Sequence, residues 1–199
     1  MTLMEHETPA RPTARQARIN AVYADYHHTD HAPDLAGLRH KPFIPGAGPT
    51  HSPDVVFLLK CPSALDSRAK TVRDGIHYRM IEDLCAGAGI TNYYVTYLVK
   101  YELAQDRDPR DLERNIALAY VREELSLLRP TLIALPGAGI NRLMFPDRQY
   151  APNDHRIING RRGSYYALPD LLPARRTHQA YADLQDEFHA LQEALERSL

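Results

Sequence analysis

Three short apolar runs, each ending abruptly in small or polar residues, dominate the hydrophobic pattern of this chain. They lie at residues 55–63 (VVFLLKCPS), 93–101 (YYVTYLVKY) and 131–135 (TLIAL), the last followed by Pro136-Gly137-Ala138-Gly139. Apolar runs rich in β-branched residues are typical of strands buried on both faces of a parallel sheet. Because segments of helical period separate the runs, the pattern predicts a β-α-β-α-β order. Three strand ends would then face one crevice, the place where α/β folds bind ligands.

The remaining elements follow from periodicity. Apolar residues recur at three- and four-residue spacing in 15–26, 74–86, a long stretch opening at Asp108-Pro109, and 177–197. A short strand is predicted at 164–168, whereas 146–163 is rich in turn residues. Together they predict an α/β protein, with three α/β/α layers around a central, mostly parallel four-stranded sheet. We expect residues 1–15 to form a flexible arm and 16–199 a single domain, which suits a chain of 199 residues.

The composition says more about the location and partners of the protein than about its activity. The 24 basic and 25 acidic residues nearly balance, so only a local basic patch could favour a nucleic-acid partner. The two cysteines, Cys61 and Cys85, are too few for a disulfide framework or a four-cysteine metal site. No apolar run approaches the roughly 20 residues of a membrane span, and the first residues lack the apolar core of a signal peptide. We therefore expect a cytoplasmic protein without membrane contact.

Two short motifs suggest a metal or a cofactor, but neither pattern is complete. His27-His28-Thr29-Asp30-His31 holds several potential ligands, yet such a short loop gives poor geometry for tetrahedral zinc, and a solvated turn is the better interpretation. Gly137-Ala138-Gly139 follows an apolar run, but the third glycine of a dinucleotide fingerprint is replaced by Arg142. We expect neither a metal nor an organic cofactor.

Four stretches, in order along the chain, together form a recognisable series. They are Gly46-Ala47-Gly48-Pro49 leading through PDVVFL to Pro62-Ser63, then YVTYLVK at 94–100 with Arg107-Asp108-Pro109, then LLRPTLIAL at 127–135, and LPDLL at 168–172. This series resembles the uracil-DNA glycosylase superfamily, most closely its family 4, over roughly residues 38–195. The resemblance implies an enzyme that flips a base out of DNA and hydrolyses its N-glycosidic bond.

The same motifs depart from the family at positions that matter to its chemistry. The family's glycine and glutamate are missing from Leu59-Lys60-Cys61-Pro62-Ser63. Tyr97 stands where the family has a uracil-reading asparagine, and Leu168 where it has a histidine. The family's four cluster cysteines are also absent. The resemblance therefore implies the fold of the family with different residues in the pocket and without an iron–sulfur cluster.

A glycosylase needs an acid that positions water or offsets positive charge on the sugar, and donors for the leaving base. Asp66, just beyond the first strand end, lies where family members carry an acidic residue and is the first catalytic candidate. Its alternative role is to cap a helix. Asp170 is the second candidate. Lys60 is expected to donate to the leaving pyrimidine, or else to extend its ammonium group from the strand end into solvent.

The base-binding residues are expected to be Lys60, Cys61, Pro62, Ser63 and Tyr97. The best-known uracil enzymes have a bulky aromatic residue at the position of Ser63, where it blocks substituents on pyrimidine C5. A serine leaves room there, so the substrate is expected to be a C5-substituted pyrimidine, for example a hydroxymethylated or glycosylated one. Tyr97 could equally be a packing residue at a strand end.

DNA contacts are expected mainly from residues 168–176 (LPDLLPARR). Leu171 or Leu172 would fill the gap left by the flipped base, and Arg175 and Arg176 would bind flanking phosphates. The alternative is a core loop followed by a solvated helix start. The remaining predicted DNA contacts are Arg161, Arg162, Lys100 and Gly137.

The sequence and its resemblance together predict a monomeric, metal-free DNA glycosylase that acts on duplex or single-stranded DNA and leaves an abasic site. Its setting is repair, phage metabolism or defence against phage. Two alternatives stay open. The protein could be a catalytically inactive DNA- or base-binding module, because the signature motifs are altered. It could also be an N-glycosidase or transferase that acts on free modified nucleotides.

Overall fold

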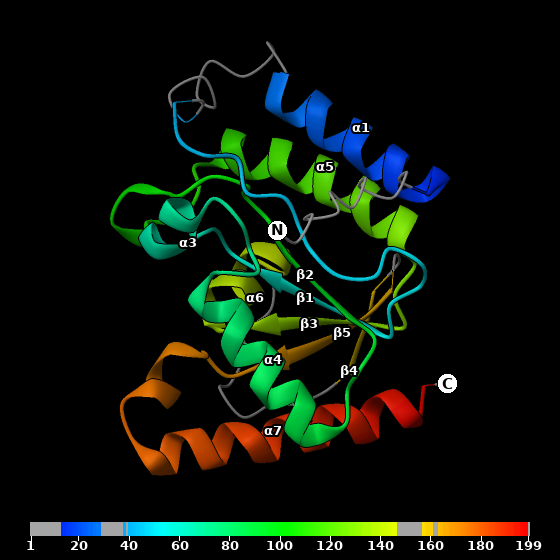
Figure 1. Ribbon diagram of the computed structural model, residues 1–199, viewed down its shortest axis with the longest axis vertical. Helices are drawn as coiled ribbons and strands as arrows, with labels where there is room; N and C mark the ends of the chain where they lie inside the picture. Colours follow the sequence, from blue (N-terminus) through cyan, green and yellow to red (C-terminus); the bar gives the residue numbers. More distant parts are fainter. Residues whose placement is uncertain (1–12, 29–37, 39, 147–156, 161–162, 199) are drawn as a thin grey trace, which may run out of the picture.

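The computed structural model describes residues 13–28, 38, 40–146, 157–160 and 163–198 (Figure 1). The strands are β1 (Val55–Leu59), β2 (Tyr93–Tyr97), β3 (Leu132–Pro136), β4 (Ile157–Gly160) and β5 (Gly163–Leu168). The α-helices are α1 (Ala14–His28), α3 (Ala64–Ala69), α4 (Ile76–Ala88), α5 (Asp111–Leu128), α6 (Ala138–Met144) and α7 (His178–Glu196). Two short 3-10 turns complete the description, η1 (Ala104–Asp106) and η2 (Leu172–Arg175).

The described strands form one sheet in the order β2-β1-β3-β5-β4. The first four are parallel, with Val55 opposite Tyr93 of β2 on one side and opposite Leu132 of β3 on the other. Parallel neighbours need crossover connections, and α4, α5 and α6 lie in those connections. The predicted α/β architecture with a four-stranded parallel core is therefore confirmed.

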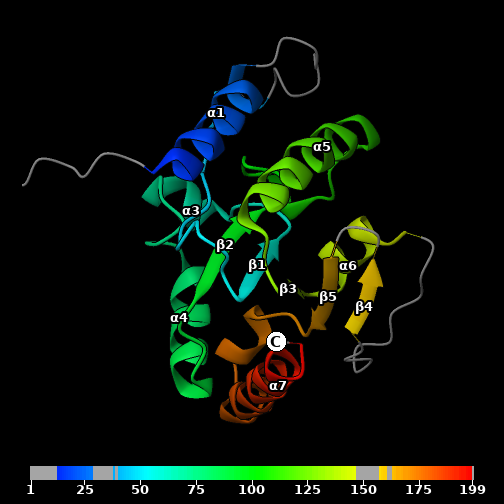
Figure 2. The same cartoon turned by 90° about the vertical axis from the view of Figure 1, so that its right-hand side faces the viewer.

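Helices cover both faces of the sheet, with α1 and α5 on one face and α4 and α7 on the other (Figure 2). Alternate residues of β1 enter the two cores: Val56 and Leu58 pack with α1 and α5, whereas Phe57 packs with α4 and α7. The Phe57 ring stacks on Phe188 of α7, with 5.5 Å between ring centroids. A central strand buried on both faces gives the unbroken apolar run seen in the sequence.

The structure corrects the sequence prediction at three places. Strand β4 lies in the stretch predicted to be turns and pairs antiparallel with β5, with Gly160 opposite Gly163 at the hairpin end. Helix α6 directly follows Gly137, whose φ of +94° is a conformation that glycine adopts without strain. Helix α5 begins at Asp111 rather than at Asp108-Pro109, because the Glu113 carboxylate accepts the N–H of Arg110 at 2.7 Å and so caps the helix there.

Candidate active site at the strand ends

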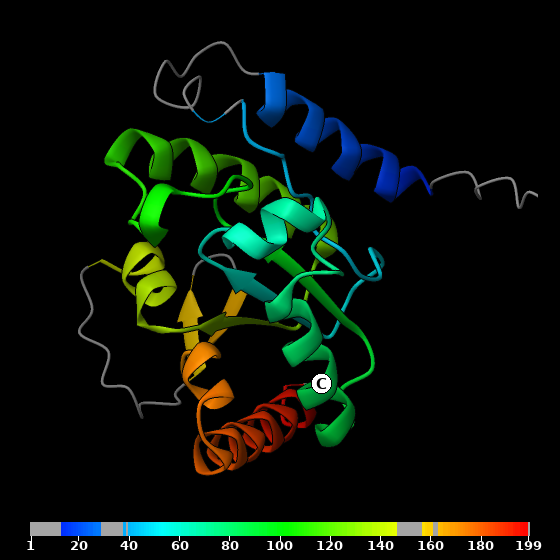
Figure 3. The same cartoon turned by 60° about the vertical axis from the view of Figure 1, so that its left-hand side comes forward.

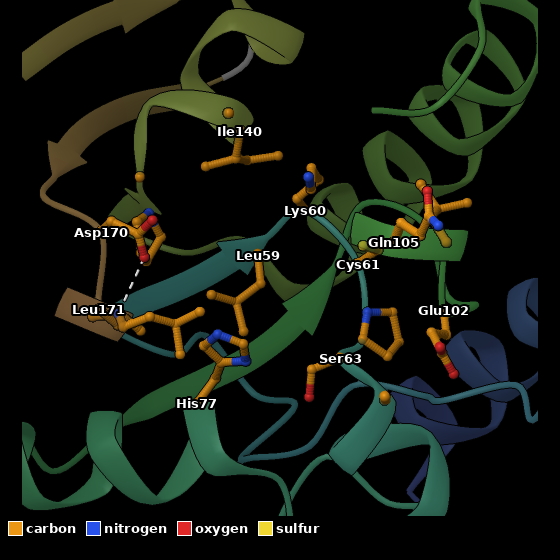
Figure 4. A pocket seen from close by; sticks show the side chains of 17 residues that line it. Leu59, Lys60, Cys61, Ser63, His77, Glu102, Gln105, Ile140, Asp170 and Leu171 are labelled. Carbon is orange, nitrogen blue, oxygen red and sulfur yellow. Dashed lines mark hydrogen bonds between the residues drawn. The ribbon is translucent and has the colours of Figure 1, made fainter. Parts of the chain in front are cut away.

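A cavity of about 430 Å³ lies at the carboxyl ends of β1, β3 and β5 (Figure 4). Its walls come from residues after β1, from the start of α4, from the segment between β2 and α5, from the start of α6 and from the residues after β5. The volume falls within the range of roughly 300–1,000 Å³ that is usual for small-ligand sites. The predicted crevice at the strand ends therefore exists and is large enough for an organic ligand.

The residues after β1 form one wall of the cavity. The structure places Lys60, Cys61, Pro62 and Ser63 there, as the base-binding prediction requires. The Lys60 ammonium lies 3.5 Å from Asp108 Oδ1, and only 18% of its side chain is exposed. Lys60 therefore does not extend into open solvent but lies at the cavity with a carboxylate beside it.

Tyr97 does not line the cavity. Its side chain is fully buried in the core between β2 and the α4–α7 layer. Burial, reinforced by the negative charge of nearby Asp66, raises the pKa of the Tyr97 hydroxyl, so this group stays protonated. The prediction that Tyr97 binds the base is wrong for this conformation, and the packing role is the one observed.

Asp66 caps helix α3 and does not line the cavity. Its Oδ2 accepts the Ser63 N–H at 2.7 Å, and its own N–H donates to Ser63 Oγ at 3.2 Å, which together make a capping box. Burial alone would raise the pKa of Asp66, but the nearby His77 ring and the hydrogen bonds from Ser63 lower it below its ordinary value. Asp66 is therefore an ionised, buried carboxylate that cannot itself touch a substrate in the cavity, and the helix-cap role is the one observed.

His77 lines the cavity, and its Nδ1 lies 3.5 Å from Asp66 Oδ2. His77 could not be predicted from a motif, because no motif spacing links it to Asp66. One signal was present, however. In a β-α-β unit the helix begins at the carboxyl edge of the preceding strand, so the first turn of α4 is bound to lie near the strand-end site.

Asp170 places a carboxylate on the cavity wall that lies across from Ser63 (Figure 4). Its Oδ1 accepts the Leu172 N–H at 3.1 Å, which fixes the side chain at the end of β5. Gly137 lies beside it and donates its N–H to the Leu168 carbonyl at 2.9 Å. A second cavity carboxylate, Glu102, was not predicted; it forms an ion pair of 3.9 Å with Lys41. Of the two aspartates proposed from sequence, only Asp170 can act on a ligand directly.

The two leucines after β5, either of which the sequence allowed as the wedge, differ in their exposure to solvent. Leu171 is 1% exposed and belongs to the core, whereas Leu172 is 40% exposed at the mouth of the same cavity. Arg175, the last residue of η2, and Arg176, which directly follows it, are both exposed. The 3-10 turn η2 (orange) immediately precedes α7 (Figure 3). Leu171 therefore cannot be the wedge in this conformation, and Leu172 remains the candidate.

Two other DNA-binding predictions have different outcomes. Lys100 is 1% exposed, and its ammonium lies 2.7 Å from Glu124, so the prediction that it binds DNA is wrong. A lysine that ends an apolar run can be buried when a carboxylate from another element meets it. Arg161 and Arg162 lie outside the described residues.

No protein-family model matches the chain, and no curated protein matches it. Among the residues that the structure describes, no three His, Cys, Asp or Glu side chains come together in a way that could hold a metal ion. No helix in the same residues combines the length and apolar character needed to cross a membrane.

Proposed function

We propose that this protein is a monofunctional DNA glycosylase that flips a C5-substituted pyrimidine into the strand-end cavity and hydrolyses its N-glycosidic bond. One observation carries the proposal. Segments that resemble uracil-DNA glycosylase motifs but lie more than a hundred residues apart, around Ser63 and around Asp170, line the same cavity. Base-flipping enzymes need such a pocket next to a surface that can hold DNA.

Asp170 is the proposed carboxylate of the reaction. It faces the cavity, and the Leu172 N–H orients it. A carboxylate in this position would offset positive charge on the sugar as the base departs and accept the proton of the attacking water. The Lys60 ammonium, on the β1 side of the cavity, would lie near the oxygen-bearing edge of the pyrimidine.

Two features favour a pyrimidine larger than uracil. Ser63 lines the cavity with a short side chain, so it leaves space for a substituent on C5. Tyr97, which replaces the uracil-reading asparagine of the similar family, is buried in the core. Hydroxymethylated and glycosylated pyrimidines of phage DNA fit this description, and the proposal places the enzyme in phage metabolism or defence, as a cytoplasmic monomer.

The proposal is tested with oligonucleotides that carry uracil, cytosine, 5-hydroxymethylcytosine or glucosylated 5-hydroxymethylcytosine, incubated with the protein and then treated with alkali. We expect strand cleavage with a C5-substituted base and little or none with uracil. Asp170→Asn should lower single-turnover release by about 10²-fold or more while DNA affinity changes little. Efficient release of uracil alone would contradict the assigned substrate.

The same assay separates the alternatives. A binding module would retain the modified DNA in a gel-shift experiment without releasing any base. An N-glycosidase for free nucleotides would release base from the mononucleotide but not from the oligonucleotide. Exposed Leu172 at the cavity, followed closely along the chain by exposed Arg175 and Arg176, favours DNA over a free nucleotide.

A further inference from the structure

We propose that His77 is the proton donor of the strand-end cavity and that Asp66 is the positioning residue that holds its ring. The inference rests on the proposed function and assigns the reaction step that Asp170 does not perform. It comes from the contact between a cavity histidine and a buried carboxylate that the sequence did not connect.

His77 is the only histidine among the described cavity residues, and it belongs to the first turn of α4. Its side chain is 14% exposed, and its ring lies near Leu59 and Ser63 on the cavity wall (Figure 4). Nδ1 is the buried ring nitrogen and is directed toward Asp66. Nε2 is consequently the nitrogen available to a ligand in the cavity.

Asp66 is held firmly enough to orient this ring. It is fully buried, and the capping box with Ser63 fixes its carboxylate. A side chain at Gly75 would collide with Asp66 Oδ1, so the glycine allows the start of α4 to approach the carboxylate closely. The distance of 3.5 Å between His77 Nδ1 and Asp66 Oδ2 is an ion-pair contact when the ring is protonated, and catalytic contacts of this length often shorten on ligand binding.

A buried carboxylate beside a histidine has two consequences. It sets which ring nitrogen carries the proton in the neutral form, and it stabilises the imidazolium form. The other groups near this pair are the protonated Tyr97 hydroxyl, behind Asp66, and the charged groups of the cavity. Those charged groups are Lys60, Glu102 and Asp170.

In the proposed hydrolysis His77 gives up one proton and Asp170 takes up one. The bond between the sugar C1′ and the pyrimidine N1 breaks, and its electron pair stays on the ring. His77 Nε2 gives a proton to the departing pyrimidine. Water adds to C1′, and its proton passes to Asp170. Return of that proton through solvent restores both residues, so the net reaction is hydrolysis without a cofactor.

The test compares His77→Gln, Asp66→Asn and the control His189→Gln, which changes an exposed histidine on α7. Single-turnover release is measured from about pH 5 to pH 9, the range in which histidine ordinarily titrates, on the DNA from which the wild-type protein releases a base. His77→Gln should lower release by about 10²-fold and remove the fall in rate toward alkaline pH, whereas His189→Gln should match wild type.

The variant Asp66→Asn distinguishes loss of the contact with His77 from a general loss of folded protein. The asparagine can still accept the Ser63 N–H, but it cannot stabilise the imidazolium. The fall in rate should therefore move to lower pH, so that the deficit of the variant narrows as the solution is acidified. A deficit equal at every pH, or a His77→Gln rate within about twofold of wild type, would overturn the assignment.

A second measurement does not depend on activity. The His77 ring signals, identified by their disappearance in His77→Gln, are followed by NMR during pH titration. In Asp66→Asn the pH dependence of these signals should differ from that in wild type, and an unchanged pH dependence would overturn the pairing. If wild type releases no base from any DNA while the titration moves as expected, the proposed function fails but the pairing stands.

Discussion

The ammonium of Lys100 lies 2.7 Å from Glu124 Oε2, and each side chain is 1% exposed. Thr96 donates its hydroxyl to Glu124 Oε1 at 2.8 Å, and Tyr23 of α1 donates to the same oxygen. Burial lowers the pKa of Lys100, and the charge of Glu124 acts in the opposite direction. The pair therefore joins the segment after β2 to α5 and α1 within the core.

Removing one member of this pair should be costly for stability. Lys100→Met leaves the Glu124 charge buried without its partner, so the free energy of unfolding should fall by about 3–5 kcal/mol. The double variant Lys100→Met/Glu124→Leu should recover much of that decrease. Urea denaturation measures both, and a single variant as stable as wild type would show that the pair is not the buried contact described.

The pH dependence of stability should reflect the carboxylate that holds the segment before α5. Glu113 is buried and accepts two bonds of 2.7 Å from the Arg107 guanidinium. Burial alone would raise the pKa of Glu113, but the bonds from Arg107 and Arg110 lower it below its ordinary value. The folded state thus binds this proton less readily than the unfolded state does.

The direction in which stability changes with pH follows from this difference in proton affinity. The stabilisation by Glu113 is complete above the ordinary glutamate pKa of about 4.3 and is lost as the pH falls through the lower folded value. Glu113→Gln should lower the free energy of unfolding by about 1–2 kcal/mol at neutral pH, since Arg107 is partly solvated. In urea melts the deficit should shrink below about pH 4. An unchanged deficit there would argue against an ionic contribution.

The two leucines after β5 should behave differently. Leu172→Ala removes an exposed side chain at the cavity mouth, so it should slow release from duplex DNA more than from single strands, because only the duplex must be unstacked. Leu171→Ala creates a cavity in the core and should instead lower the free energy of unfolding by about 2–5 kcal/mol. Equal effects of Leu172→Ala on both substrates would exclude it as a wedge.

Arg175 and Arg176 should contribute to DNA affinity by binding phosphates. The double variant Arg175→Ala/Arg176→Ala should weaken binding and reduce the slope of log affinity against log salt by about one unit for each phosphate that the protein no longer binds. Arg79→Ala, an exposed arginine on α4, is the matched control. A double variant with the wild-type slope would place the DNA-binding surface elsewhere.

The sequence by itself determined the four parallel strands and the place of the cavity, but not strand β4. Residues 55–59 form an unbroken apolar run because β1 is covered on both faces, and such a pattern is local. The break in that run at Lys60-Cys61-Pro62-Ser63 marked one cavity wall, because chains leave a parallel sheet at its carboxyl edge.

Tertiary structure decided which side chains reach the cavity. Whether Asp66 catalyses or caps depends on a helix start that brings His77 against it, and whether Lys100 meets DNA or the core depends on Glu124, 24 residues away. Likewise Leu171 and Leu172 have the same side chain and differ only in what covers them. Periodicity encodes burial along one element, but pairing between elements depends on the packing of the whole chain, and there polar and charged residues acquire their roles.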